Sequence, residues 1–141
     1  GASSAEVKKV ALAAIERARV YVILDTLEYL EKGGRIGKAS ALVGGLLSVK
    51  PVLTVKDGEV HPFEKVRSRA KALQRIREVV RGEGPYSEIQ VLYSTDTEEA
   101  AALAADLQDL TPDKAIMLVR VGPVIGTYAG PGAVGVALLK S

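Results

Sequence analysis

The sequence predicts a single α/β domain, with helices packed on a mixed β-sheet. A length of 141 residues suffices for one domain with a hydrophobic core and is short for two typical domains. Short apolar runs of strand length alternate with segments whose apolar residues recur at helical spacing. The dipeptide Asp57-Gly58 predicts an antiparallel hairpin, whereas a strand–helix–strand spacing after residue 89 favours parallel strands. The combination of both strand directions indicates a mixed sheet.

The N-terminal segment begins with a predicted helix over residues 4–17. Ser3 and Glu6 have the spacing of a capping box, in which each side chain accepts a hydrogen bond from the other residue's backbone. Apolar residues then recur at intervals of three and four, which predicts a helix with one apolar face. Residues 20–24, VYVIL, follow as a short and fully apolar strand candidate.

A second helix is predicted to begin at Asp25, because Asp25 and Glu28 repeat the capping-box spacing. Gly33-Gly34 is expected to end this helix by supplying positive φ. One helical face is then predicted for Ala39, Leu42, Val43, Leu46 and Leu47. Gly44-Gly45 within that run costs roughly 1 kcal/mol per Gly relative to Ala. This cost indicates a close backbone approach to another element or to a ligand chain.

Residues 51–56 and 59–66 flank Asp57-Gly58 and are predicted to be the strands of the hairpin. Pro62 has no N–H for a strand ladder, so the second strand is expected at a sheet edge or with a bulge. Ser68 is then predicted to cap a helix whose apolar residues face inward. The charged residues expected to face water are Arg69, Lys71, Arg75, Arg77 and Arg81.

The last third completes the predicted sheet. Residues 89–93 and 115–121 are predicted strands, and residues 96–107 form an Ala-rich helix between them, capped by Thr95 with Glu98. A glycine-rich turn then leads into a final strand, residues 134–138. The strand–helix–strand order fits a crossover between parallel strands.

Composition excludes several classes of function. A net charge of +2 gives no case for nucleic acid, so a cationic role must be local. The chain has no cysteine and one histidine, and we expect no metal and no cofactor. The most apolar window, residues 39–55, is interrupted by Lys50 and is too short to span a bilayer. The N-terminal residues lack the apolar region of a secretory signal. We therefore expect a cytoplasmic protein, for which peripheral contact with a membrane stays open.

Arg35 is the first candidate for a binding residue. It lies between Gly34 and Ile36-Gly37, in a turn whose backbone can approach a ligand closely. Its guanidinium presents a planar, charged fork to a carboxylate or phosphate. The alternative is a surface arginine that caps the carbonyl groups of the preceding helix.

A second polar turn is predicted near the C-terminus, formed by Gly126, Thr127, Tyr128, Gly130 and Gly132. Its hydroxyl and free N–H groups could bind an anion as a backbone nest does. It matches neither a Walker loop nor GxGxxG. The alternative is a plain connection between two strands.

Catalytic residues are not predicted. His61 has no acidic or nucleophilic partner at a telling spacing, and no two carboxylates are placed for acid–base chemistry. Arg67, Arg69 and Lys71 form a local basic cluster. This cluster is either a solvated face or a docking site for an acidic protein surface.

Two blocks of sequence resemble the DegV family of bacterial fatty-acid-binding proteins. The first is residues 24–73, LDTLEYLEKGGRIGKASALVGGLLSVKPVLTVKDGEVHPFEKVRSRAKAL, and the second is residues 122–137, GPVIGTYAGPGAVGVA. The resemblance extends over essentially the whole chain but covers only the C-terminal half of a family member. It implies that the family's N-terminal domain lies outside residues 1–141.

The resemblance implies an acyl carrier rather than an enzyme. A long-chain fatty acid would lie with its acyl chain in an apolar tunnel and its carboxylate near the cleft between two domains. A separate fatty acid kinase subunit would phosphorylate that carboxylate with ATP. The implied partners are therefore the fatty acid, the kinase subunit and the protein's own N-terminal domain.

The resemblance also assigns roles to individual residues. Arg35 falls on the arginine of the GGRIG motif, which is implied near the head group. Thr127 and Tyr128 fall on the threonine and histidine of the family's usual GTH turn. Tyr128 can donate a hydrogen bond but carries no positive charge near pH 7. Arg67 falls on the arginine of the EKVR segment, which is implied to face the kinase.

The predicted ligand-binding residues are Arg35, Leu42, Leu46, Ile125, Gly126, Thr127 and Tyr128, with Leu42, Leu46 and Ile125 against the acyl tail. The predicted partner-binding residues are His61, Arg67 and Arg69. An alternative of a different class is a protein-interaction domain that docks a partner through Arg67, Arg69 and Lys71 and binds no ligand alone. A small-molecule enzyme has the least support, since the sequence shows no nucleophile–base pair.

Overall fold

A computed structural model describes residues 1–44 and 50–141. Within these ranges, six strands form one mixed sheet in the order β3-β2-β1-β6-β4-β5. The strands are β1 (Ala18–Ile23), β2 (Val52–Lys56), β3 (Glu59–Glu64), β4 (Tyr86–Tyr93), β5 (Met117–Arg120) and β6 (Val134–Lys140). Neighbours pair antiparallel except β4 and β5, which are parallel. The predicted fold class is confirmed.

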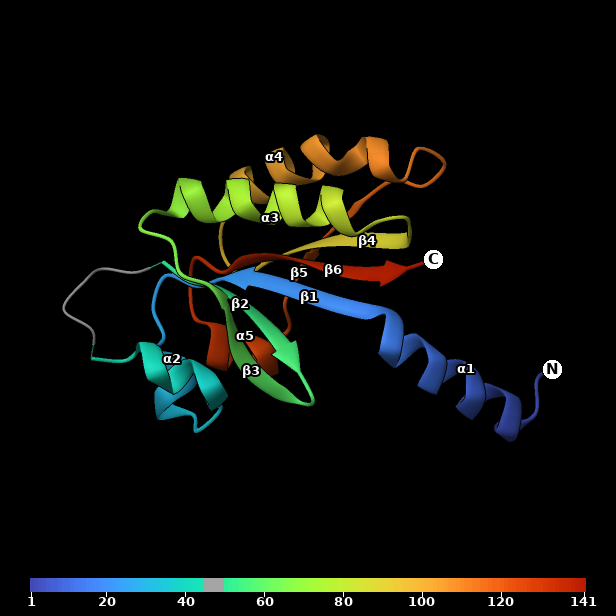
Figure 1. The fold of residues 1–141 in the computed structure, drawn as a ribbon, viewed down its shortest axis with the longest axis horizontal. Coiled ribbons are helices and arrows are strands. Elements are labelled where there is room, and N and C mark those ends of the chain that lie inside the picture. The colour runs from blue at the N-terminus through green and yellow to red at the C-terminus, as the bar shows by residue number, and fades with distance from the viewer. Residues whose placement is uncertain (45–49) are drawn as a thin grey trace.

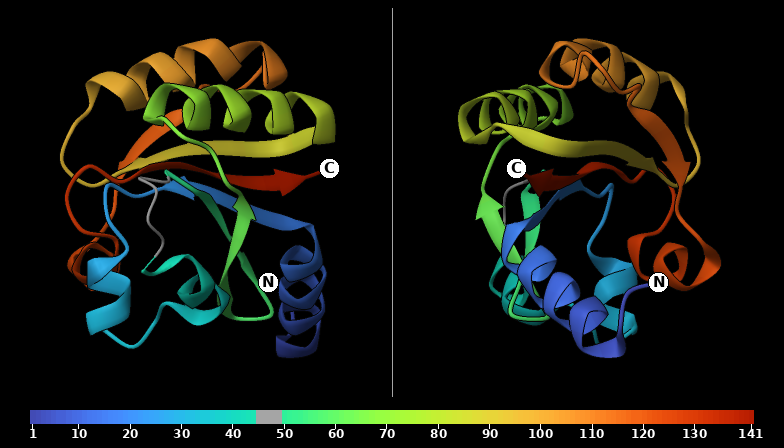
Figure 2. Two further views of the ribbon diagram at one scale, coloured as in Figure 1. Left: turned by 60° about the vertical axis from the view of Figure 1, so that its left-hand side comes forward. Right: turned by 90° about the vertical axis from the view of Figure 1, so that its right-hand side faces the viewer.

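Helices cover both faces of the sheet (Figures 1 and 2). On one face lie α3 (Arg69–Glu83) and α4 (Glu98–Leu107), the second of which connects the two parallel strands as predicted and continues into a short 3₁₀ turn, η2 (Gln108–Leu110). On the opposite face lie α2 (Glu28–Lys32), the 3₁₀ helix η1 (Gly37–Leu42) and α5 (Pro123–Ala129). This second face is the thinner layer, because its helices are short.

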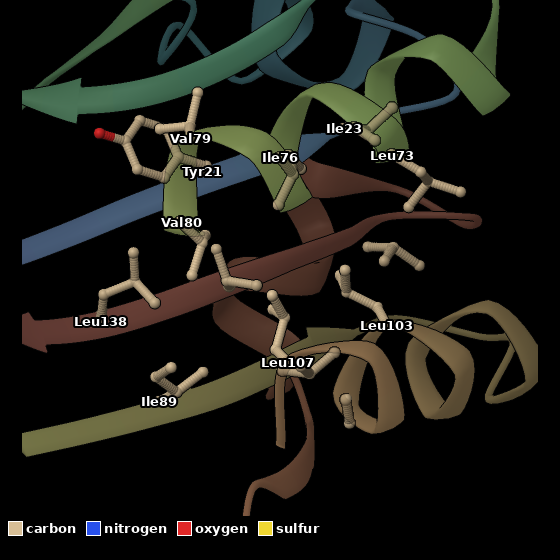
Figure 3. Packing of buried hydrophobic residues seen from close by; sticks show 14 of the residues in the cluster. Tyr21, Ile23, Leu73, Ile76, Val79, Val80, Ile89, Leu103, Leu107 and Leu138 are labelled. Atoms are coloured by element: carbon tan, nitrogen blue, oxygen red, sulfur yellow. The ribbon is translucent and has the colours of Figure 1, made fainter. Parts of the chain in front are cut away.

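The main hydrophobic core lies between the sheet and the α3/α4 layer. Figure 3 shows Ile76 and Val80 of α3 close to Leu103 and Leu107 of α4, all four fully buried. Alternate residues of the central strands β1, β4 and β6 point into this layer, as the pleat of a strand requires. A smaller apolar cluster lies on the other face and consists of Leu24, Leu30, Ala39, Leu53, Ala129 and Ala133.

The first helix, α1 (Ser4–Arg17), leads away from the sheet (Figure 1). The predicted capping box is confirmed: Ser3 Oγ accepts from Glu6 N at 3.3 Å, and Glu6 Oε2 accepts from Ser3 N at 2.6 Å. No residue of α1 is buried, and Ile15 on its apolar face is 69% exposed. The periodicity therefore predicted the helix correctly, and its apolar face makes no buried contact within the described residues.

The hairpin of β2 and β3 forms as predicted. Asp57 and Gly58 have φ of 52° and 78°, and a two-residue loop with positive φ at both positions is a type I′ turn. Strand β3 lies at the edge of the sheet, and the register shifts next to the pair of Leu53 and Pro62. Both consequences expected of Pro62 are therefore present.

Two predicted helix caps are wrong. Asp25 does not cap α2, which begins at Glu28 with Thr26 Oγ1 accepting from Glu28 N at 3.1 Å. The Asp25 carboxylate is instead bound by an arginine from α3. Thr95 does not cap α4, because Asp96 Oδ1 accepts from Glu98 N at 2.9 Å. Tertiary hydrogen bonds took both side chains away from the local caps that their spacing predicted.

The helical face predicted over residues 39–47 is also wrong in its described part. A 3₁₀ helix ends at Leu42, Val43 is extended with ψ of 137°, and Gly44 has φ of 79°. Gly44 thus turns the chain out of the helix rather than allowing a close approach within it. Leu46 and Leu47 lie outside the described residues.

Candidate functional site

An apolar cavity of about 390 Å³ lies on the face of the sheet that carries α2 and α5. Strands β1, β2, β3, β4 and β6 line it on the sheet side, and α2 and α5 line it on the other. Among the described residues around it, Arg35 alone carries a charge. The apolar lining residues from the strands are Val20, Val22, Leu53, Val55, Val60, Leu92, Val134 and Gly135.

The side chains of β1 alternate between the main core and the cavity. Tyr21 and Ile23 point into the main core, so Val20 and Val22 point to the cavity. Val22 pairs with Gly135 of β6, which contributes no side chain to the same face. A Cβ at Gly135 would lie 2.4 Å from Tyr21 O and 3.0 Å from Val22 Cβ, so glycine lets β1 and β6 approach closely here. The short helices α2 and α5 cover this face of the sheet and leave the cavity beneath them.

Arg35 and Tyr128 both line the cavity and lie beside each other. The guanidinium carbon of Arg35 lies 5.6 Å from the centre of the Tyr128 ring, within the range of a cation–π contact. Gly33 makes this arrangement possible, because a Cβ at that position would lie 2.4 Å from the Tyr128 ring. Arg35 is itself exposed, so its charge lies where the apolar lining meets solvent. The cavity thus has a mainly apolar lining and one cationic group at its solvent boundary, beside the Tyr128 ring.

The glycine-rich turn predicted for residues 126–128 is wrong, because these residues belong to α5. Pro123 begins the helix, where its fixed φ and missing N–H are favourable. The Thr127 hydroxyl donates to the Pro123 carbonyl oxygen at 2.7 Å, and Gly126 N donates to Gly122 O at 2.8 Å. The groups expected to form an anion nest are therefore used within the helix. Positive φ appears only after the helix, at Gly130 and Gly132.

The helix α5 separates the predicted ligand-binding residues into two groups. Ile125 and Tyr128 line the apolar cavity together with Arg35. Gly126 and Thr127 line a second, more open cavity of about 730 Å³, on the side of α5 next to Arg120. The remaining predicted residues are elsewhere: Leu42 packs against the smaller apolar cluster without lining either cavity, and Leu46 lies outside the described residues.

The predicted partner-binding residues are separated by the structure. Arg67 is exposed, and His61 is half-buried on β3 with Nε2 4.0 Å from Glu59 Oε2. Arg69 does not face water as predicted, since its guanidinium turns inward to Asp25 and Glu99. Within the described residues, only Arg67 and Lys71 of the basic cluster are exposed without an ion pair.

Two further findings bear on the kind of site. In the described part of the chain, no helix has both the length and the apolar character needed to cross a membrane. Over the same residues, no group of three or more acidic, cysteine or histidine side chains is placed to hold a metal ion. The candidate site is therefore the apolar cavity with Arg35 and Tyr128 in its lining.

Comparison with known proteins gives the family. The sequence profile of a family described as "uncharacterised protein, DegV family" matches residues 1–141. The chain belongs to the DegV family. This finding confirms the resemblance drawn from residues 24–73 and 122–137. A DegV domain-containing protein of Streptomyces coelicolor is 44% identical over 121 residues, which are 84% of this chain and 43% of that protein.

Solved DegV structures share the fold. The fatty acid binding DegV family protein from Streptococcus agalactiae superposes with a TM-score of 0.86 at 31% identity, over 99% of this chain and 50% of that one. A structure described as fatty acid binding of a DegV family protein from Thermus thermophilus gives a TM-score of 0.84 at 33% identity, over 100% of this chain and 52% of that one. This DegV chain therefore spans about half the length of the relatives that it matches.

Proposed function

We propose that this DegV chain binds a long-chain fatty acid, with the acyl chain in the 390 Å³ cavity and the carboxylate toward Arg35 and Tyr128. The observation that carries the proposal is that Arg35, an exposed residue, is the single charged group among the described residues lining a largely apolar cavity. An amphiphile with one anionic end fits that arrangement better than a polar metabolite or an uncharged hydrocarbon. The description of the two DegV structures as fatty acid binding supports the same class of ligand.

The acyl chain would supply most of the affinity. Burial of each methylene contributes roughly 0.8 kcal/mol, so a chain of many methylenes offsets the cost of association. Arg35 is exposed, and a solvated charge pair contributes little free energy. The guanidinium would therefore orient the ligand, with the Tyr128 hydroxyl as a second hydrogen-bond donor to the carboxylate.

We further infer that the chain is a carrier subunit and not the catalyst. In this proposal it is the C-terminal domain of a two-domain protein, and the N-terminal domain completes the cleft around the carboxylate. A separate fatty acid kinase would phosphorylate the carboxylate, which Arg35 and Tyr128 hold at the solvent boundary of the cavity. The family resemblance supports this division of roles.

The first test is direct binding of a fatty acid. We expect the purified, delipidated chain to bind cis-parinaric acid with a dissociation constant of about 1 μM or lower, and palmitate to displace it. The measurement is the increase in probe fluorescence on titration. Methyl palmitate, which lacks the negative charge, is the matched competitor and should displace the probe less well. Absence of probe uptake, together with no fatty acid on solvent extraction and mass spectrometry, would refute fatty-acid binding by this chain.

The second candidate function, docking of a protein partner, is favoured by one observation. Lys71 in the first turn of α3 and Arg67 just before the helix are exposed cations, and both lack an ion pair within the described residues. They lie outside the set of residues that line the apolar cavity. Partner docking and ligand binding would therefore use separate faces of this domain.

Arg67→Glu tests this separation. We expect acyl phosphate formation by a fatty acid kinase to fall about tenfold or more, because a like charge at a docking face opposes association. Fatty-acid affinity should stay unchanged. Acyl phosphate is trapped with hydroxylamine and measured as the hydroxamate. Lys9→Glu on α1 makes the same charge reversal at another exposed site and serves as the control. Weaker fatty-acid binding by Arg67→Glu would contradict the assignment of Arg67 to a separate face.

A further inference from the structure

The guanidinium of Arg69, at the start of α3, joins three separate parts of the chain. Its Nη1 donates to Asp25 Oδ1 at 2.7 Å, its Nε to Glu99 Oε2 at 2.7 Å, and its Nη2 to the Gly132 carbonyl oxygen at 2.6 Å. The hydrogen bond to Glu99 raises the pKa of the guanidinium. Arginine is always protonated in proteins, and only 24% of the Arg69 side chain is exposed.

Two of the three acceptors lie in loops that lead into or out of the two helices lining the cavity, α2 and α5. Asp25 lies between β1 and α2, and α2 supplies Leu30 to the lining. Gly132 lies between α5 and β6, and α5 supplies Tyr128. The third acceptor, Glu99, is in the first turn of α4, which is anchored in the main core. Arg69 thus ties both loops to the rigid side of the sheet.

The two loops also contact each other directly. Gly132 has φ of 75°, and a Cβ at that position would lie 2.1 Å from Asp25 Oδ2. Gly130 packs in the same way against the Tyr29 ring, where a Cβ would lie 2.5 Å from Cδ2. Thr95 Oγ1 accepts from Gly132 N at 3.0 Å. With this close packing, a displacement of one loop must displace the other.

We propose that Arg69 is a positioning residue for the ligand cavity, which sets the distance between the α2 and α5 walls by holding Asp25 and Gly132 together. This role rests on the proposed fatty-acid-binding function. Arg69 does not line the cavity and acts through the two loops. Arg69 therefore supports the ligand cavity from outside its lining, whereas Arg67 and Lys71 of the basic cluster are exposed on the surface.

Arginine suits this position for a geometric reason. A planar guanidinium satisfies three acceptors in fixed directions, whereas the ammonium group of lysine is a compact point charge on a flexible stem. Without the guanidinium, the Asp25 carboxylate and the Gly132 carbonyl oxygen would lie near each other with no cation between them. Repulsion between these acceptors would move the two loops apart and loosen the walls that they carry.

The test compares Arg69→Gln with Arg77→Gln in this chain. Arg77 is on the same helix, has the same 24% side-chain exposure, and pairs with Asp106 at 2.7 Å, but it contacts neither cavity loop. We expect the dissociation constant for cis-parinaric acid to rise about tenfold in Arg69→Gln and to stay at the wild-type value in Arg77→Gln. Affinities are compared at a temperature at which all variants are fully folded by circular dichroism.

Amide hydrogen exchange gives a second measurement that does not depend on the ligand. We expect faster exchange in residues 24–33 and 123–133 of Arg69→Gln, and no change there in Arg77→Gln. Arg69→Lys keeps the charge, and we expect it to give intermediate values in both measurements. It also replaces Arg69→Gln should that variant fail to fold.

Each outcome decides a separate question. Equal affinities and equal exchange in the Arg69 and Arg77 variants would overturn the positioning role. Full recovery in Arg69→Lys would overturn the geometric argument for arginine, because a point charge at this position would then hold the two loops. Failure of the wild-type chain to bind cis-parinaric acid, together with no fatty acid on solvent extraction, would refute the proposed function and leave the role of Arg69 to be decided by exchange in the two loops.

Discussion

Val22→Trp is expected to abolish fatty-acid binding while the fold is kept. Val22 lies next to the C-terminal end of β1 and lines the cavity, on the face of the sheet opposite the main core, so a larger ring at this position would project into the cavity. An indole there would occupy the space proposed for the acyl chain. Exclusion of about four methylenes would cost about 3 kcal/mol, which is a loss in affinity of about 100-fold. The measurement is titration with cis-parinaric acid, with circular dichroism as the test of folding.

Val7→Trp is the matched control for this substitution. Val7 lies on α1, is 57% exposed and does not line the cavity. The same change of side chain should leave fatty-acid affinity at the wild-type value. Unchanged affinity in a folded Val22→Trp variant would show that the ligand does not occupy this cavity, even if the chain binds fatty acids.

Ile76→Ala is expected to lower the free energy of unfolding by about 2–5 kcal/mol. Ile76 lies in the middle of α3, is fully buried and packs in the main core between α3, α4 and the sheet (Figure 3). Truncation removes buried methylenes and leaves a space that close-packed neighbours fill only in part. Urea denaturation should show a lower midpoint with an unchanged slope.

Ile15→Ala makes the same chemical change at an exposed site. Ile15 on α1 is 69% exposed, so its truncation should change the free energy of unfolding by less than about 0.5 kcal/mol. A loss in Ile15→Ala comparable to that in Ile76→Ala would mean that α1 buries its apolar face in solution. That result would contradict the described arrangement of the helix.

The parts of the fold that could be predicted are those with local causes. The Ser3 and Glu6 capping box, the Asp57-Gly58 turn and the position of Pro62 each depend on residues within a few positions of one another. The two helix caps that were predicted wrongly, at Asp25 and Thr95, failed because of contacts with distant parts of the chain. Both side chains bind partners that are distant in sequence, and no local pattern signals that competition.

The candidate site could be predicted only in part. Arg35 and Tyr128 are 93 positions apart, and their joint assignment came from the family resemblance rather than from spacing. Alternation within β1 could have indicated Val20 and Val22, but the sequence does not specify which face of the sheet stays open. Glycine content suggested a turn at residues 126–128, although Pro123 was a signal for a helix start.

Pro62 bears on how the protein behaves at high concentration. An edge strand with free N–H and C=O groups can recruit a strand from a neighbouring molecule and so begin aggregation. Strand β3 is such an edge, but Pro62 has no N–H to offer and the register shifts beside it. An added strand would meet a missing donor and a distorted backbone at the same place. The proline thus protects this edge of the sheet against self-association while the hairpin still forms one wall of the cavity.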